Sequence, residues 1–328
     1  MSPTRLDVRA YRDGVLAGDR RMIAKTITLL ESRRADHVEL GQRVLDALAP
    51  HSGDSIRVGV TGAPGVGKST LIETLGLQLI EKGHRLAVLA IDPSSPVSGG
   101  SILGDKTRMT RLSQLEQAFI RPSPSGQTLG GVAHRTREAL LVCEAAGFEI
   151  VLVETVGVGQ SETEVASMVD SFAVLLQPGA GDELQGIKRG VLELADVLVV
   201  NKADGEQRRA AGRTRAAYAQ ALELLRPQSE HWHPRVLTVS ARTGAGIEEL
   251  WDVVMEHRRV QERTGLLERR RRRQARAWLW RLLREGLEEV FRSDPAVAAE
   301  LERAERAVEE RLSTAPSAAR ALLEKFRR

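Results

Sequence analysis

The chain has 328 residues, enough for one large domain and a smaller appendage at roughly 100–200 residues per domain. Aromatic residues make up only 3% of it, so Leu, Val, Ile and Ala must supply the core, which suits a parallel sheet covered by helices. The net charge of +4 is too small to indicate a nucleic-acid-binding protein, and no apolar run approaches the ~20 residues of a membrane span.

The single cysteine, Cys143, excludes an intrachain disulfide and a cysteine-based metal cluster. It lies in an apolar run, so we expect a buried structural thiol. Arg5, Arg9 and Arg12 interrupt the first residues, where a secretory signal would need an apolar core. These features predict a cytoplasmic protein.

Residues 1–52 predict an N-terminal helical extension. Apolar residues from Ile23 to Leu48 recur at helical spacing, and the segment from Pro50 to Asp54 then breaks the pattern. We expect this extension to pack on the domain that follows.

Residues 62–69 read G-x-x-x-x-G-K-S between an apolar strand and a helix, which is the context of a phosphate-binding loop. Its glycines allow successive backbone N–H groups to face a phosphate at the positive end of the helix. Lys68 would reach the terminal phosphates and Ser69 would hold Mg²⁺. The predicted phosphate-binding residues are Gly62, Ala63, Pro64, Gly65, Val66, Gly67, Lys68, Ser69 and Thr70.

Acidic residues follow two further predicted strands. The apolar run 86–91 ends in Asp92, and a glycine-rich loop leads from there to Asp105. This composition fits a segment that closes on a metal–phosphate centre, and it fits a polar surface connection equally well. The strand 149–154 ends in Glu154, where nucleotide hydrolases sense the terminal phosphate and more often carry Asp.

The stretch from Gln177 to Lys188 follows another apolar strand and has glycines at 179, 181 and 186. Such a loop can change conformation, although a rigid turn uses the same residues.

Residues 201–204 read N-K-x-D after the apolar strand 197–200, and this motif is specific for guanine. The Asp204 carboxylate can accept both the ring N–H and the exocyclic amine of guanine, an edge that adenine lacks. Charged hydrogen bonds of this kind are worth about 1.5–3 kcal/mol each. An S-A segment after the last strand would offer a backbone N–H to the guanine carbonyl. The predicted guanine-binding residues are Asn201, Lys202, Asp204, Ser240, Ala241 and Arg242.

Two other stretches carry weaker patterns. His231 and His233 flank one residue without a third ligand nearby, so a structural loop is preferred to a metal site. The five arginines from Arg269 to Arg273 favour a solvated helix face over a nucleic-acid contact, because no aromatic residues interleave them. The apolar stripe from Trp278 to Phe291 indicates self-association.

Together these stretches resemble the methylmalonyl-CoA mutase-associated GTPases of the MeaB/ArgK type, which are chaperone G proteins of the SIMIBI class. The resemblance spans nearly the whole chain, and Glu154 is the residue typical of this family at its position. It implies a three-layer α/β P-loop NTPase fold with a mostly parallel sheet. The implied organisation is an N-terminal helical extension (1–52), a GTPase domain (53–262) and a C-terminal helical dimerisation region (263–328).

The resemblance also implies a Mg²⁺-dependent GTPase that binds GTP and GDP and turns over slowly until a partner accelerates it. The implied partner is an adenosylcobalamin-dependent acyl-CoA mutase, whose cofactor loading and protection the GTPase gates without itself binding cobalamin. Nucleic acid and membrane partners are not expected. The implied catalytic residues are Lys68, Asp92, Asp105 and Glu154, the metal-binding residues Ser69, Asp92, Asp105 and Glu154, and the switch residues Gln177, Asp182 and Lys188.

Two other hypotheses are a metal-inserting G protein and a kinase linked to basic amino-acid transport. The chain lacks the histidine or cysteine clusters that metal chaperones usually carry. No acceptor site for a kinase stands out either.

Overall fold

The computed structural model describes residues 6–91, 109–122, 129–155, 161–179, 189–223 and 229–327. These residues form two compact units, 1–268 and 269–328, and the boundary falls within one long helix. Among the described helices, none is both long and apolar enough to cross a membrane.

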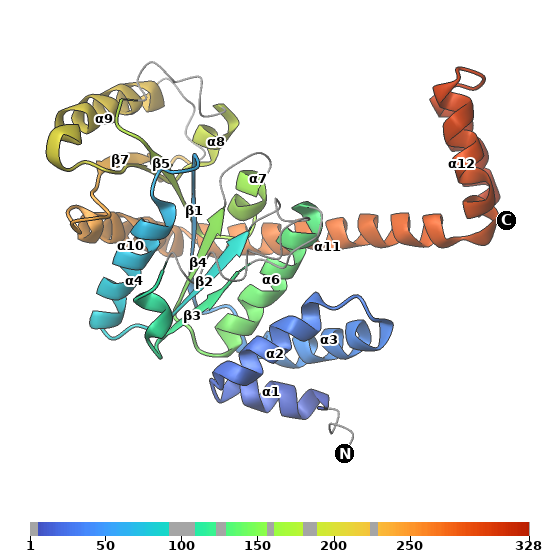
Figure 1. Cartoon of the computed structure of the whole chain (residues 1–328), viewed down its shortest axis with the longest axis horizontal. Helices are drawn as coiled ribbons and strands as arrows, with labels where there is room; N and C mark the ends of the chain where they lie inside the picture. Colours follow the sequence, from blue (N-terminus) through green and yellow to red (C-terminus); the bar gives the residue numbers. More distant parts are fainter. Residues whose placement is uncertain are drawn as a thin grey trace. The chain divides into compact units, whose positions relative to one another are not determined.

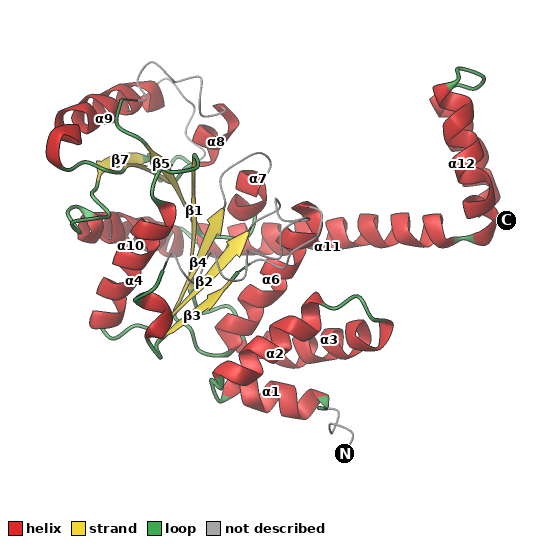
Figure 2. Cartoon of the chain, in the orientation of Figure 1, coloured by secondary structure: helices red, strands yellow, loops and turns green. Residues whose placement is uncertain are grey.

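The first unit is built on a seven-stranded sheet in the order β3-β2-β4-β1-β5-β6-β7, and neighbouring strands pair in parallel throughout (Figures 1 and 2). The α/β P-loop fold with a parallel sheet is therefore confirmed. The strands are β1 (Ile56–Gly62), β2 (Leu86–Ile91), β3 (Ala118–Arg121), β4 (Ile150–Thr155), β5 (Ser171–Leu176), β6 (Val197–Val200) and β7 (Arg235–Thr238).

Helices cover both faces of this sheet, which explains why β2, β4, β5 and β6 are buried at every position. Consecutive residues of one strand enter opposite cores: Val88 joins the core under α4 and α10, whereas Leu89 joins the core under α6. The covering helices are α4 (Lys68–Glu81), α6 (Leu129–Ala145), α7 (Ser161–Ala166), α8 (Arg189–Leu194), α9 (Arg208–Glu223) and α10 (Ile247–Arg263). Short 3₁₀ turns are η1 (Ala49–His51), η2 (Leu112–Gln114) and η3 (Gly205–Gln207).

The N-terminal extension forms the helices α1 (Val8–Leu16), α2 (Arg20–Glu31) and α3 (Ala35–Leu48), which pack on one another and on α6. Asp7 and Asp19 cap the first two helices by accepting backbone N–H bonds. Ile23 and Val44 are fully buried in the same core as α6. The expected packing of this extension on the following domain is confirmed.

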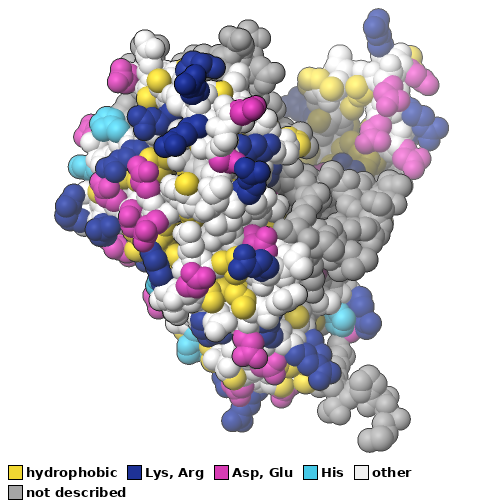
Figure 3. Space-filling model, turned by 60° about the vertical axis from the view of Figure 1, so that its left-hand side comes forward, with side chains coloured by type: hydrophobic (Ala, Val, Ile, Leu, Met, Phe, Trp, Pro, Cys, Tyr) yellow, Lys and Arg dark blue, Asp and Glu magenta, His cyan; other side chains and the backbone are white. Residues whose placement is uncertain are grey.

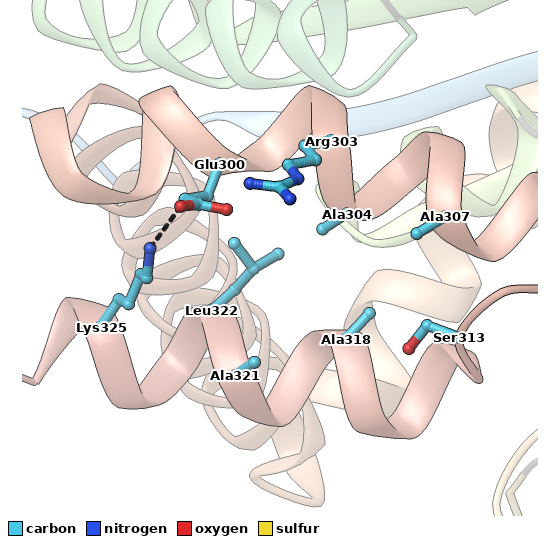
Figure 4. Close-up of a pocket in the computed structure, with 9 residues that line it drawn as sticks. All are labelled: Glu300, Arg303, Ala304, Ala307, Ser313, Ala318, Ala321, Leu322 and Lys325. Carbon is cyan, nitrogen blue, oxygen red and sulfur yellow. Dashed lines mark ion pairs between the residues drawn. The ribbon is translucent and has the colours of Figure 1, made fainter.

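The second unit contains most of α11 (Leu266–Ser293), followed by α12 (Pro295–Glu309) and α13 (Ala315–Phe326). Asp294 and Thr314 cap the last two helices. A cavity of about 220 Å³ lies between α12 and α13. Figure 4 shows Ala304 and Ala321 among the residues that line it. An ion pair of 2.7 Å between Glu300 and Lys325 lies at one end of it.

Charged side chains are interspersed over the face of the first unit that Figure 3 shows, without a patch of one sign. Cys143 is fully buried, as expected, and burial raises the pKa of its thiol.

An ion pair at the amino end of β1 ties the sheet to α6. The Arg57 guanidinium donates two bonds of 2.7 and 2.8 Å to the Glu144 carboxylate, which also accepts from Ser55 Oγ and from the Gly53 N–H. The Glu144 side chain is only 1% exposed. Four donors therefore compensate one desolvated carboxylate.

We expect Glu144→Gln to lower the free energy of unfolding by about 3 kcal/mol, because it leaves the Arg57 charge without its partner in a dry site. Glu248→Gln is the matched control: Glu248 pairs with Lys82 at the surface, and such pairs are worth about 0–1 kcal/mol. Urea denaturation of both variants measures the difference. Equal losses in the two variants would contradict a structural role for the buried pair.

Candidate functional site

The carboxyl ends of β1, β4, β6 and β7 lie on one edge of the sheet, because all four strands run in parallel. Ligands in open α/β sheets bind outside this edge. The segments that the sequence predicts to bind phosphate and guanine follow β1, β6 and β7, so the fold brings them to the same edge.

The predicted phosphate-binding residues run from Gly62, the last residue of β1, into the first turn of α4. Gly67 has φ +98°, and a Cβ atom added there would lie 2.5 Å from Asn201 Nδ2. Only glycine fits this position without strain. The Lys68 ammonium group is largely buried and donates to the carbonyl oxygens of Gly62 at 2.7 Å and Ala63 at 3.1 Å. These bonds hold the cation within the curl of the loop.

Ser69, in the first turn of α4, contacts Glu154 near the carboxyl end of β4. Ser69 Oγ donates to Glu154 Oε1 at 2.8 Å, and the Glu154 carboxylate is buried. One residue further on, the hydroxyl groups of Thr61 and Thr155 lie 2.7 Å apart and link the ends of β1 and β4. Two side-chain oxygen atoms from different secondary-structure elements thus converge beside the loop.

Asn201 connects the predicted base-binding segments to the phosphate-binding loop. Its Nδ2 donates to the Val66 carbonyl at 2.9 Å, and its Oδ1 accepts from the Ala241 N–H at 3.0 Å. Lys202 follows in the left-handed region at φ +60°, and its Nζ donates to the Gly65 carbonyl at 2.6 Å. A single buried amide therefore sets the spacing of three loops.

Asp204 presents its carboxylate between Ser240 and Arg242. Ser240 Oγ donates to Oδ1 at 2.9 Å, and the Arg242 guanidinium donates to Oδ2. The residue is the N-cap of η3, but its side chain makes no cap bond there. The carboxylate therefore makes no hydrogen bond to the first turn of η3 and is bound by Ser240 and Arg242 of the segment after β7.

One residue of the site was not identified from the sequence. Thr74 Oγ1, on α4, donates to the Ala241 carbonyl at 2.6 Å and fixes the segment after β7 on the helix that the phosphate-binding loop begins. A threonine four residues after Thr70 on the same helix face gave no local indication of this contact.

Asp92, Asp105, Asp182 and Lys188 lie outside the described residues. Gln177 directly follows β5, which pairs with β1, so it lies at the same edge of the sheet. Two residues on, the Gly179 N–H donates to Thr214 Oγ1 of α9 at 3.1 Å.

The sequence model of a family described as "Methylmalonyl Co-A mutase-associated GTPase MeaB" matches residues 23–296. A "Putative GTPase" of Caulobacter vibrioides is 53% identical over 98% of this chain and 98% of its own length. "GTPase ArgK" of Escherichia coli is 51% identical over 80% of this chain and 79% of its own. "Methylmalonic aciduria type A homolog, mitochondrial" of Mus musculus is 47% identical over 90% of this chain and 74% of its own.

Among solved structures, one described as "Crystal structure of LAO/AO transport system kinase" superimposes with a TM-score of 0.79 at 37% identity. The match covers 98% of both chains. The similarity to these proteins thus extends well beyond the phosphate-binding loop.

We expect Gly67→Ala to lower the free energy of unfolding by about 1–2 kcal/mol, because a Cβ is strained at positive φ and meets the Asn201 amide. Gly212→Ala is the control, since Gly212 lies on α9 with open space around its Cβ position. There, alanine should be neutral or stabilise by up to about 1 kcal/mol. Chemical denaturation that finds both variants equally stable would contradict the close contact.

Proposed function

Because the chain belongs to the methylmalonyl-CoA mutase-associated GTPase family and is a P-loop GTPase, we propose that it gates adenosylcobalamin loading of an acyl-CoA mutase and protects that enzyme. The observation that supports nucleotide binding is the pair of hydrogen bonds made by the Asn201 side chain, which links the phosphate-binding loop to the predicted base-binding segment after β7. The base and the phosphates of a bound nucleotide would thereby contact loops that the Asn201 side chain connects.

The triphosphate would lie in the loop formed by residues 62–70, at the N-terminus of α4. Backbone N–H groups and the helix dipole favour an anion there. Lys68 is placed to exchange its carbonyl partners for β- and γ-phosphate oxygens. The loop then supplies both position and charge, which is most of what phosphoryl transfer requires.

Mg²⁺ fits the oxygen atoms of Ser69 and Glu154, because this hard cation takes one or two protein oxygens and completes its shell with phosphate and water. When bound, it neutralises charge on the phosphates. We assign Asp92 and Asp105 to the same centre on their sequence positions after β2. Glu154 is a buried carboxylate beside the loop, and we assign it to orient the water that attacks the γ-phosphate.

Guanine would be recognised by Asp204, with Asn201, Lys202 and the segment Ser240–Arg242 forming the pocket. A carboxylate that accepts two N–H groups from one base edge distinguishes guanine from adenine strongly, since the wrong base leaves a charge unsatisfied. The products would be GDP and phosphate, formed from GTP and water.

The mutase partnership is supported by the family description, which names methylmalonyl-CoA mutase. We propose that residues 177–188, including Asp182 and Lys188, transmit the nucleotide state to that enzyme. Gln177 starts this stretch at the end of β5, next to the strand that carries the phosphate-binding loop. The cytoplasmic location remains a prediction.

We further propose a homodimer through α11. Trp280, Leu283, Leu287 and Val290 are exposed large hydrophobic residues at alternating spacings of three and four. This spacing is typical of the seam of a two-helix contact, and surface of this kind is typically covered by another chain.

The kinase hypothesis gains one observation, because the similar solved structure is named a transport system kinase. A kinase transfers the γ-phosphate to an acceptor, whereas a GTPase releases it to water. The fate of a labelled γ-phosphate therefore separates the two hypotheses.

We expect Asp204→Asn to reduce GDP affinity about 10- to 100-fold while leaving the weak binding of ATP unchanged, because one charged acceptor of guanine is lost. Glu206→Gln, an exposed carboxylate two residues on, is the matched control. Titration with fluorescent nucleotides measures both. An unchanged preference for GTP over ATP in Asp204→Asn would refute the base-pocket assignment.

We expect a cognate adenosylcobalamin-dependent mutase to raise the rate of GTP hydrolysis at least about tenfold, since intrinsic turnover is slow until a partner completes the site. The assay follows released phosphate and protein-bound label from γ-labelled GTP. Glu154→Gln, tested with the same mutase, should lose the acceleration. Hydrolysis that is no faster with the mutase, or label that accumulates on protein, would count against the proposal.

A further inference from the structure

The Asp204 carboxylate has two different neighbours. Oδ1 accepts from Ser240, which is buried and whose Oγ also accepts the Thr243 N–H at 3.2 Å. Oδ2 accepts from Arg242, whose side chain is 78% exposed, whereas the Asp204 side chain is only 20% exposed. One oxygen is therefore fixed by the fold, and the other is covered by a side chain that reaches in from solvent.

The exposed partner has the same donor chemistry as the proposed ligand. A guanidinium is planar and presents parallel N–H donors that match a carboxylate. The edge of guanine that Asp204 would bind presents a ring N–H and an amine N–H in one plane. Arg242 and guanine therefore require the same oxygen with the same kind of bond.

We propose that Arg242 is a competing cap on Asp204, which guanine must displace to enter the base pocket. The proposal rests on the assignment of Asp204 to guanine and adds a regulatory role for its neighbour. Arg242 lowers the affinity for guanine nucleotides by slowing their association, and it leaves the interactions of the phosphates unchanged.

The exposure of Arg242 sets the size of the effect. A surface ion pair is worth about 0–1 kcal/mol, so its displacement should cost at most about fivefold in affinity. Salt screens such pairs, and the cost should shrink as ionic strength rises. A buried arginine would instead block the pocket outright.

Other groups of the site also have protein partners, but those partners lie inside the site. Lys68 donates to carbonyls of its own loop, and Ser69 donates to Glu154, both within the elements that would contact phosphate. Arg242 differs because its side chain is largely in water. It can leave Asp204 without moving a strand, a helix or the phosphate-binding loop.

The test compares Arg242→Ala with wild type in stopped-flow binding of fluorescent GDP at low salt. We expect the association rate constant to rise about two- to fivefold, with an unchanged dissociation rate constant. Arg242→Lys should retain part of the competition, because it keeps the charge and loses the planar fork. Lys82→Ala is the matched control, since Lys82 forms a similar exposed ion pair at the far end of α4. It should bind GDP as wild type does.

A double-mutant cycle separates competition from a general effect of charge. Asp204→Asn offers an amide N–H to the second carbonyl of xanthine, so its binding of fluorescent XDP can be measured. In that background Arg242 has no carboxylate to cover, and Arg242→Ala should change XDP association less than about 1.5-fold.

The outcomes are distinct. If Arg242→Ala weakens GDP binding or leaves it unchanged, or if its effect persists in the Asp204→Asn background, the competing cap is refuted. If wild type shows no preference for guanine nucleotides over ATP, the assignment of the base pocket fails instead.

Discussion

The arrangement of the loops at the carboxyl ends of the strands depends on one buried amide, that of Asn201. Its Nδ2 donates to the Val66 carbonyl and its Oδ1 accepts from the Ala241 N–H. One side chain therefore connects the loops that follow β1, β6 and β7. Gly67 must lack a Cβ for this amide to approach the loop. A buried amide without these partners would carry a desolvation penalty of about 1–3 kcal/mol, so the connection contributes to stability whatever ligand is bound.

Because the strands run in parallel, this connection lies at their carboxyl ends. The contacts at their amino ends hold the helices on the sheet. At the amino ends of the strands, Arg57 and Glu144 form a dry ion pair, and the Arg258 guanidinium donates to the Ser55 carbonyl at 3.0 Å. His257 contacts Ser171 through Nδ1 at 2.8 Å in the same region, and it is buried against Trp232. This edge anchors α6 and α10 to the sheet, so the loops of the other edge extend from a rigid base.

Local sequence patterns predicted the parts of the fold that local physics determines. Continuous apolar runs gave the buried strands, and the glycine pattern gave the loop before α4. They could not give the partners of Glu144, Thr74 or Arg242, which lie 87, 167 and 38 residues away from them in sequence. Such contacts arise from the order of strands in the sheet, which no segment encodes alone. Glu154 was recognisable as an acid at a strand end, but its bond to Ser69 depends on β1 and β4 being neighbours.

The polar groups at the carboxyl ends of the strands are paired with other protein groups, because an isolated charge in a low-dielectric site is costly. The Lys68 cation, the Glu154 carboxylate and the Asp204 carboxylate each bond to a protein group. A ligand that enters such a site exchanges bonds and does not simply add them, so its net affinity reflects small differences between large terms. Selectivity then depends on how well the ligand reproduces the geometry of the bonds it replaces. In the proposed base pocket, a planar guanine edge would replace the guanidinium at Asp204, whereas adenine lacks the paired N–H donors, so the exchange itself would discriminate between the bases.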